Sequence, residues 1–251
     1  MWLVLCASTD LSAIWAYEGL KKRGLDPIRL VPTEALAQGV RWEHRVGADG
    51  ACVDITLADG SRIRNTGVRG VLNRILYVPP GSLLLIHPPD RDYVMEELGT
   101  FFLSWLYAMP QPMLNRPTPL GLSGQWRHAS EWVCLASRAG LPTADYRQSS
   151  HDLSQGMSIA TRVVPPGTPT RTVLVVDGQV AGPPAPVHIL EGCLRLGALS
   201  KTLLLGAEFT VGPGDRWTFV GATTHPDLRP GGKRFLDLLA RALAVEPGGE
   251  S

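Results

Sequence analysis

The sequence predicts an α/β protein: an open sheet with crossover helices, followed by a reduced α+β domain. The first half opens with an apolar strand, a helix and a second strand, and a further apolar strand and a long helix follow. In the second half, hairpins and helices alternate. The β-α-β opening indicates two parallel strands joined by a crossover helix.

The first half begins with an apolar run at 2–6, and the small and polar residues 7–10 suit a turn and a helix cap. From Leu11 apolar residues recur at helical spacing, and Gly24 follows a basic last turn. The remaining predicted elements are a strand at 28–31, a hairpin over 52–57 and 62–64, a strand over 68–75 that ends in Asn73 and Arg74, and a long, largely buried helix over 93–109.

The proline-rich stretch 110–119 predicts a boundary, which gives domains at 1–112 and 113–251. Gly140 closes the first helix of the second domain in the C-cap position, and Asp177-Gly178 is a two-residue hairpin turn. The predicted elements are a helix over 125–139, a hairpin over 171–176 and 179–181, a helix over 187–199, strands over 203–211 and 217–220, and a helix over 232–244.

The composition excludes several classes of protein. Lys and Arg number 24 and Asp and Glu 23, so the net charge of +1 leaves no basic excess for a nucleic-acid backbone. No run of about 18 apolar residues predicts a membrane span, and the apolar N-terminus lacks the basic start of a signal peptide. The four cysteines have no paired spacing. This indicates reduced thiols in a cytoplasmic protein.

Three common motifs are absent. In the run 121–124, Gln125 follows where the G-x-S-x-G nucleophile elbow needs glycine. Gly231-Gly232-Lys233 continues with Arg234 rather than Ser or Thr, so it is no P-loop. The six histidines show no metal-binding spacing. The residues alone therefore predict no hydrolase, P-loop or histidine-metal chemistry.

The order of elements carries a family resemblance. Its markers are the β-α-β opening, the strand that ends in Arg74, the loop Asn115-Arg116-Pro117, the helix that ends in 139–142, and the late strand with Gly206-Ala207-Glu208-Phe209. Together they resemble the ATP-grasp superfamily over most of the chain. The resemblance implies a pre-ATP-grasp domain, then α+β subdomains that hold ATP and activate a carboxylate as an acyl phosphate for attack by an amine or thiol.

The resemblance also implies a magnesium site, from which this sequence departs. Glu208 falls at the first acidic position of the family's metal pattern and is a candidate ligand, although it could equally be a structural acceptor in the sheet. The family's E-x-N on the next strand is matched by Gly221-Ala222-Thr223, which offers no second carboxylate and a poor replacement for the amide. The magnesium set is therefore incomplete.

The segment between Tyr146 and Thr172 is the second departure from the family. The family inserts a nucleotide-binding subdomain there, and about 25 residues are too few to build it around a core. No lysine occurs between Lys22 and Lys201 to reach the phosphates. Arg127 or Arg162 could substitute, although an exposed arginine is the favoured interpretation.

A truncated scaffold could still bind a ligand where strand ends and helix N-termini meet. Ser8, Thr9 and Asp10 are candidates for the polar lining of such a site, and helix capping is an equal alternative. Arg74 and Arg116 are candidate carboxylate or phosphate contacts, with a surface ion pair as the alternative.

We therefore predict a degenerate ATP-grasp-like pseudoenzyme, a binding or assembly subunit with a protein or peptide partner, a possible homo-oligomeric state and no cofactor. Trp126 and Trp132 are aromatic side chains that could anchor an interface, although tryptophans more often lie in the core. The alternative is an unusual ATP-dependent carboxylate-amine ligase that uses Glu208, magnesium and arginines. A small-molecule sensor or an enzyme without ATP has no positive motif.

Overall fold

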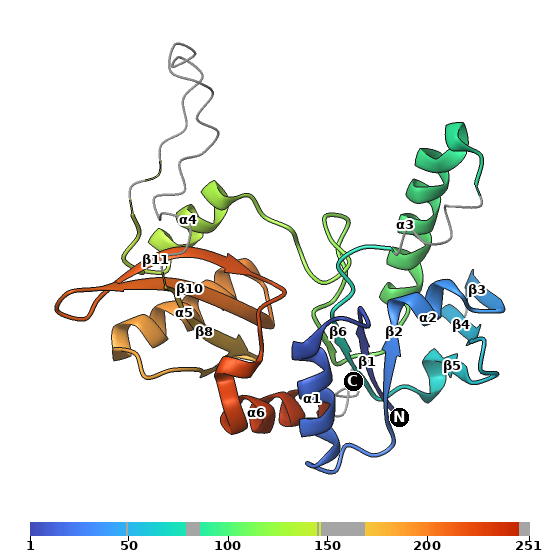
Figure 1. Cartoon of the computed structure of the whole chain (residues 1–251), viewed down its shortest axis with the longest axis horizontal. Helices are drawn as coiled ribbons and strands as arrows, with labels where there is room; N and C mark the ends of the chain where they lie inside the picture. The colour runs from blue at the N-terminus through green and yellow to red at the C-terminus, as the bar shows by residue number, and fades with distance from the viewer. Residues whose placement is uncertain (49, 79–85, 145, 147–168, 246–251) are drawn as a thin grey trace. The chain divides into compact units, whose positions relative to one another are not determined.

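The computed structural model describes residues 1–48, 50–78, 86–144, 146 and 169–245 (Figure 1). The chain forms two compact units. Unit 1 comprises Met1–Trp126, Asp227–Arg229 and Leu236–Ser251, and unit 2 comprises Arg127–Pro226 and Pro230–Phe235. We expected a division between residues 112 and 113. The first unit extends beyond that point because Met113–Leu114 forms strand β7 of its sheet.

A parallel sheet forms the centre of unit 1. Its strand order is β2-β1-β6-β7, with β1 at Trp2–Cys6, β2 at Ile28–Pro32 and β6 at Gly70–Asn73. The crossover helix α1 spans Leu11–Lys21, and β1 pairs in parallel with both β2 and β6. The predicted β-α-β opening and the open α/β sheet are therefore confirmed.

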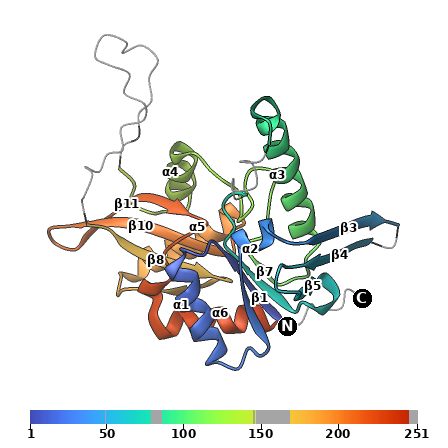
Figure 2. The ribbon, with the colours of Figure 1, turned by 45° about the vertical axis from the view of Figure 1, so that its right-hand side comes forward.

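A second, antiparallel sheet in unit 1 has the order β3-β4-β5, with β3 at Arg41–Gly47, β4 at Gly50–Thr56 and β5 at Arg62–Arg64. The sequence predicted the hairpin of β4 and β5. It missed β3, which lies beside β4 in Figure 2. It also missed the short helix α2 at Thr33–Ala37 and the 3-10 turn η1 at Asn65–Gly67.

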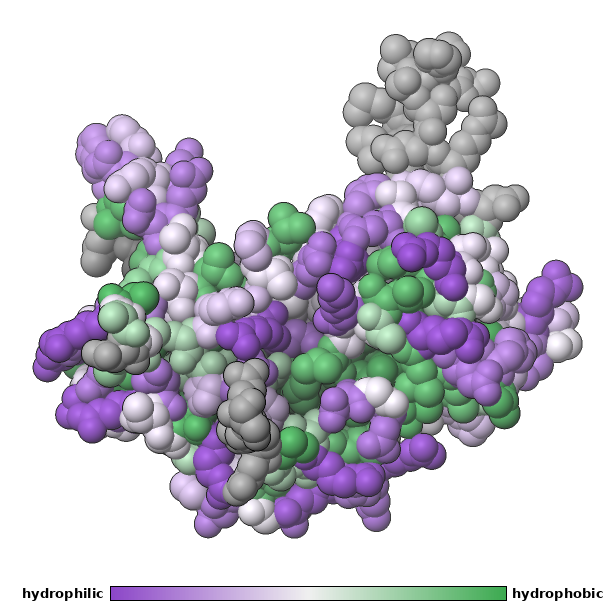
Figure 3. Space-filling model, turned by 180° about the vertical axis from the view of Figure 1, so that it is seen from behind, coloured by the Kyte–Doolittle hydropathy of each residue, from purple (hydrophilic) through white to green (hydrophobic). Residues whose placement is uncertain are grey.

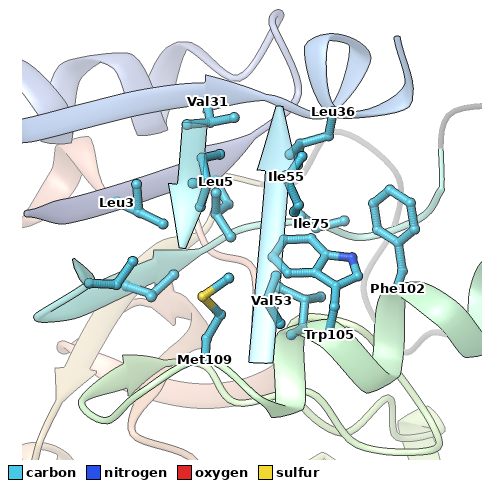
Figure 4. Packing of buried hydrophobic residues seen from close by; sticks show 14 of the residues in the cluster. Leu3, Leu5, Val31, Leu36, Val53, Ile55, Ile75, Phe102, Trp105 and Met109 are labelled. Atoms are coloured by element: carbon cyan, nitrogen blue, oxygen red, sulfur yellow. The ribbon is translucent and has the colours of Figure 1, made fainter. Parts of the chain in front are cut away.

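Helix α3 at Arg91–Tyr107 follows the 3-10 turn η3 at Pro88–Asp90. The prediction that this helix is largely buried is wrong, because only Phe102, Trp105 and Leu106 are buried, all near its C-terminal end. Tyr93 in its first turn is 65% exposed. Figure 4 shows Trp105 inside the core of unit 1. Its ring centroid lies 5.5 Å from that of Trp42 on β3.

Unit 2 contains an antiparallel sheet of order β11-β10-β8-β9. Its elements are α4 at Ala129–Arg138, β8 at Arg171–Val176, β9 at Gln179–Ala181, α5 at Val187–Ser200, β10 at Leu204–Gly212 and β11 at Arg216–Thr223. Asp177 and Gly178 have φ of 46° and 70°, as a type I′ hairpin turn requires. The predicted hairpin and strand pair are confirmed, whereas α4 starts later than expected, after the cap His128.

The last helix, α6 at Gly232–Ala244, follows the 3-10 turn η5 at Arg229–Gly231. From Leu236 onward it belongs to unit 1, where a Cβ on Gly19 of α1 would lie 2.5 Å from Leu236 Cδ1. The indole Nε1 of Trp2 donates to the carbonyl of Leu243 at 3.0 Å. The C-terminal end of α6 is thus hydrogen-bonded to the beginning of β1. Within the described residues, no helix is both long and apolar enough to cross a bilayer.

Candidate functional site

The strand pair β10–β11 holds the positions that the sequence singled out as a metal site. Glu208 lies directly opposite Gly221, and Gly206 lies opposite Thr223. Because directly opposite residues of an antiparallel pair share one face of the sheet, these four positions lie on the same face. The structure therefore brings the expected metal positions together, and only one of them carries a carboxylate.

Within the part of the chain that the structure describes, the space around Gly221 is open. A Cβ built on Gly221 would meet no atom of the described residues within 4 Å, whereas one built on Gly206 would lie 2.5 Å from Pro226 Cβ. The face is therefore closed at Gly206, and room for a longer side chain exists beside half-buried Glu208.

The residues at this face do not fit a magnesium ion held by several oxygen ligands. Mg²⁺ prefers carboxylates and octahedral oxygen coordination. Opposite Glu208 stands a glycine, and the Thr223 hydroxyl already accepts from the His225 N–H at 3.0 Å. Among the described residues, no group of three or more His, Cys, Asp or Glu could hold a metal. A role of Glu208 as a metal ligand remains a prediction.

At the carboxyl edge of the parallel sheet, Asp10 and Arg74 form a buried pair. Arg74 Nε donates to Asp10 Oδ2 at 2.7 Å, and the two side chains are 2% and 9% exposed. Asp10 Oδ1 also accepts from the Ala13 N–H at 2.9 Å, which caps α1. The arrangement supports the capping interpretation of Asp10, and it places Arg74 in the interior rather than in a surface ion pair.

Ser8 and Thr9 differ in their surroundings. The Ser8 hydroxyl and backbone N–H both donate to the carboxylate of Glu34 on α2, at 3.1 Å for the closer oxygen of each, while Thr9 is exposed. Sequence reasoning missed Glu34, since nothing in the local pattern links it to the turn after β1. Burial raises the pKa of the nearby Cys6 thiol to about 12, and the negative charge of Asp10 acts in the same direction.

The two arginine candidates make structural contacts. In unit 1, the guanidinium of Arg116 lies 4.2 Å above the Tyr107 ring and donates to the Tyr107 carbonyl at 3.2 Å. In unit 2, Arg127 pairs with Glu131 and donates to the Ser200 carbonyl at 3.1 Å, which ties the start of α4 to the end of α5. Burial lowers the pKa of Arg127. The third candidate, Arg162, lies outside the described residues.

The two tryptophans of the predicted interface differ in how far they are buried. Trp132 on α4 is buried in the core of unit 2, at 5% exposure. Trp126, which ends the first segment of unit 1, is 66% exposed, and its backbone N–H donates to the carbonyl of Leu120, which is 59% exposed. Only Trp126 is therefore available as a surface anchor.

Comparison with known proteins gave matches among solved structures. Neither the family models nor the curated proteins matched the sequence. The macrocyclase MdnC of Microcystis aeruginosa MRC, bound with precursor peptide MdnA, matches with a TM-score of 0.75 and 13% identity over 98% of this chain and 99% of that one. A RiPP-associated ATP-grasp ligase of Chryseobacterium gregarium, in complex with ADP and a leader and core peptide, gives 0.69 and 10% over 97% and 95%.

A third solved structure agrees. The ATP-grasp ligase PsnB, complexed with a minimal precursor, Mg and ADP, gives a TM-score of 0.64 and 15% identity over 96% of each chain. At such identities the likeness establishes the fold alone. The chain has the mixed α/β fold of the ATP-grasp ligases, as the order of its elements predicted. The short segment between Tyr146 and Thr172, on which the predicted truncation depends, lies mostly outside the described residues.

Proposed function

We propose that this chain is a non-catalytic protein of the ATP-grasp fold that binds a peptide or protein partner. The observation that carries the proposal is the pairing of Glu208 with Gly221. A ligase that activates a carboxylate with ATP must neutralise the triphosphate, and carboxylate-bound magnesium supplies that charge. One carboxylate opposite a glycine is a weak ligand set for such an ion.

The positively charged side chains also support a non-catalytic function. Phosphate contacts need lysine or arginine side chains that reach the ligand. The sequence has no lysine between Lys22 and Lys201. In the described residues, the guanidinium of Arg74 is held by Asp10 and that of Arg127 by Glu131. Because both guanidinium groups already pair with carboxylates of the protein, they support the proposed loss of nucleotide chemistry.

The solved structures of the same fold support the choice of partner. All three were determined with a precursor peptide or its leader and core. Hydrophobic side chains also reach the surface of this chain among hydrophilic ones (Figure 3). Trp126 and Leu120 are both exposed, and a backbone hydrogen bond joins them. Tryptophan is enriched among the residues that dominate binding energy.

Two measurements on the purified protein test the proposal. ATP with magnesium should leave the thermal unfolding midpoint unchanged, since a ligand that does not bind cannot stabilise the folded state. Selection from a displayed random peptide library, without nucleotide, should enrich sequences with a shared motif, and a synthetic copy should bind at a one-to-one ratio. Stabilisation by ATP and magnesium that disappears in Glu208→Gln would contradict the proposal.

The second candidate function is a carboxylate-amine ligase that uses ATP and magnesium. The open space beside Glu208 favours it, because a phosphate-bound ion could enter there. Phosphate release from ATP in the presence of an acid and an amine, abolished in Glu208→Ala, would establish it. The homo-oligomeric state that we predict is checked separately, by light scattering during size-exclusion chromatography.

A further inference from the structure

A cavity of about 310 Å³ lies in unit 1, at the amino ends of β1 and β6. Its walls include Trp2, Val68, Arg69 and Gln111, together with Leu243 at the end of α6. Asp10 and Arg74 stand at the opposite, carboxyl edge of the same sheet. The cavity is therefore separate from every candidate site described above, and its volume is at the lower end for small-molecule sites.

Arg69 gives the cavity an available cation. Its guanidinium carbon lies 4.3 Å from the centroid of the Trp2 ring, and the side chain is exposed. Among the described residues, no carboxylate pairs with it. Stacking on an indole leaves the N–H groups at the rim of the guanidinium able to donate in the plane. Arg69 can thus bind a carboxylate while it remains on Trp2.

Gln111, another residue of the cavity wall, carries an unused donor. Its Oε1 accepts from the Met113 N–H at 3.1 Å, which fixes the orientation of the amide. Its Nε2 is buried and has no hydrogen-bond partner within the described part of the chain. Buried amide nitrogens are normally satisfied by the protein, by water or by a ligand. A ligand acceptor that reaches Nε2 from the cavity would therefore satisfy this donor.

The rest of the wall is apolar. Trp2 Nε1 is already bound to the Leu243 carbonyl, so the indole presents its ring. Val68 and Leu243 are buried, and Val245 contributes a further aliphatic side chain. The carbonyl end of α6 repels anions, so a negative group belongs on the side of Arg69. The cavity is thus polar at one side and aliphatic at the other.

We propose that this cavity binds a small carboxylate with an aliphatic body, of the size of an N-acylated amino acid. The carboxylate pairs with Arg69, the aliphatic part lies against Trp2, Val68 and Leu243, and an acyl oxygen accepts from Gln111 Nε2. This binding site goes beyond the proposed peptide-binding function and does not depend on it.

The test uses N-acetyl-leucine and its neutral analogue N-acetyl-leucinamide. Titration of the full chain, followed by the indole N–H resonance of Trp2, should give a saturable shift with the acid and a much weaker one with the amide. Arg69→Gln keeps a side chain above Trp2 and removes the charge, so it should weaken binding at least about tenfold. Arg64→Gln is the matched control, because Arg64 on β5 pairs with Asp54 and does not line the cavity.

A second variant tests the amide. Gln111→Glu keeps the acceptor for the Met113 N–H but replaces the donor by a carboxylate oxygen, which should abolish binding of the acid. An unchanged unfolding midpoint shows that each variant is folded. Equal binding of acid and amide, equal effects of Arg69→Gln and Arg64→Gln, or no shift of the Trp2 resonance would overturn the proposal.

Discussion

Arg74 Nε donates to the carboxylate of Asp10 at 2.7 Å, in a pair that is almost completely buried. The two residues stand at the ends of different segments: Asp10 caps α1 after the first strand, and Arg74 follows β6. Both residues were candidate ligand contacts, and their opposite charges pair with each other. The residues that could otherwise have bound a ligand therefore hold this edge of the sheet together.

Removal of one partner from this pair should destabilise unit 1. Arg74→Ala removes the buried guanidinium that neutralises Asp10, and we expect a loss of about 3–5 kcal/mol in the free energy of unfolding. Urea denaturation followed by circular dichroism measures it. Arg229→Ala, which removes the exposed partner of Asp227, should change stability far less. Similar losses in the two variants would show that the Asp10–Arg74 pair is exposed to water in solution.

Local sequence patterns predicted those helices and strands whose structure depends mainly on the residues within them. The opening β-α-β and the hairpin around Asp177-Gly178 follow from apolar periodicity and turn chemistry, and both are present. Strand β3 escaped prediction because only Trp42 and His44 face inward, and they pack against Phe101 of α3, which is distant in the sequence. The burial of α3 was overestimated because its apolar residues do not themselves show which part of the helix other elements cover.

The candidate sites also differ in how far the sequence could predict them. The register of Glu208 against Gly221 was predictable because β10 and β11 are consecutive antiparallel strands. The Asp10–Arg74 pair joins residues 64 positions apart, and it depends on two strands that become neighbours only in the folded sheet. The contact of Ser8 with Glu34 depends on the short helix α2, which has no signal in the sequence.

The four cysteines should divide into two reactivity classes. Cys52 and Cys134 are exposed, whereas burial raises the pKa of Cys6 and that of Cys193 to about 12. Under native conditions a maleimide should label the first two rapidly, and all four should react in denaturant, as mass spectrometry would show. Rapid native labelling of Cys193 would contradict its place in the core.

The same two buried thiols predict a loss of stability in alkali. An unfolded thiol loses its proton near its ordinary pKa of 9.0, while the folded protein keeps that proton until the pH approaches about 12. The folded state therefore binds more protons in this window, and the free energy of unfolding falls as pH rises from about 9. Denaturant titrations at increasing pH measure the slope, which should be smaller in Cys193→Ala.

Two glycines on one face of the unit 2 sheet should respond differently to alanine. Gly206→Ala places a Cβ 2.5 Å from Pro226, whose ring cannot move aside, and we expect a loss of about 1–3 kcal/mol. Gly221→Ala meets no described residue within 4 Å, and its effect should stay within about 0.5 kcal/mol. Thermal unfolding compares them directly. A large loss in Gly221→Ala would mean that the space opposite Glu208 is filled in solution.

Trp126 and Trp132 should separate partner binding from stability. Trp132→Ala empties a core position and should cost about 3–5 kcal/mol. Trp126→Ala removes an exposed ring, so we expect little change in stability and a clear loss of affinity for the selected peptide. Isothermal titration with both variants checks this. Unchanged affinity in Trp126→Ala would place the docking surface elsewhere.

Restoring the missing ligands tests the relation between Glu208 and Gly221 most directly. The double substitution Gly221→Glu and Thr223→Asn places a second carboxylate in the open space and an amide oxygen next to it on the same face. Because a divalent ion binds more tightly as carboxylate ligands are added, the variant should gain saturable Mn²⁺ binding, measured by electron paramagnetic resonance. Adding Glu208→Gln to the double variant should remove it. If the unmodified chain binds Mn²⁺ as well as the double variant does, the glycine opposite Glu208 has not cost the protein its metal, and the case for a non-catalytic chain fails.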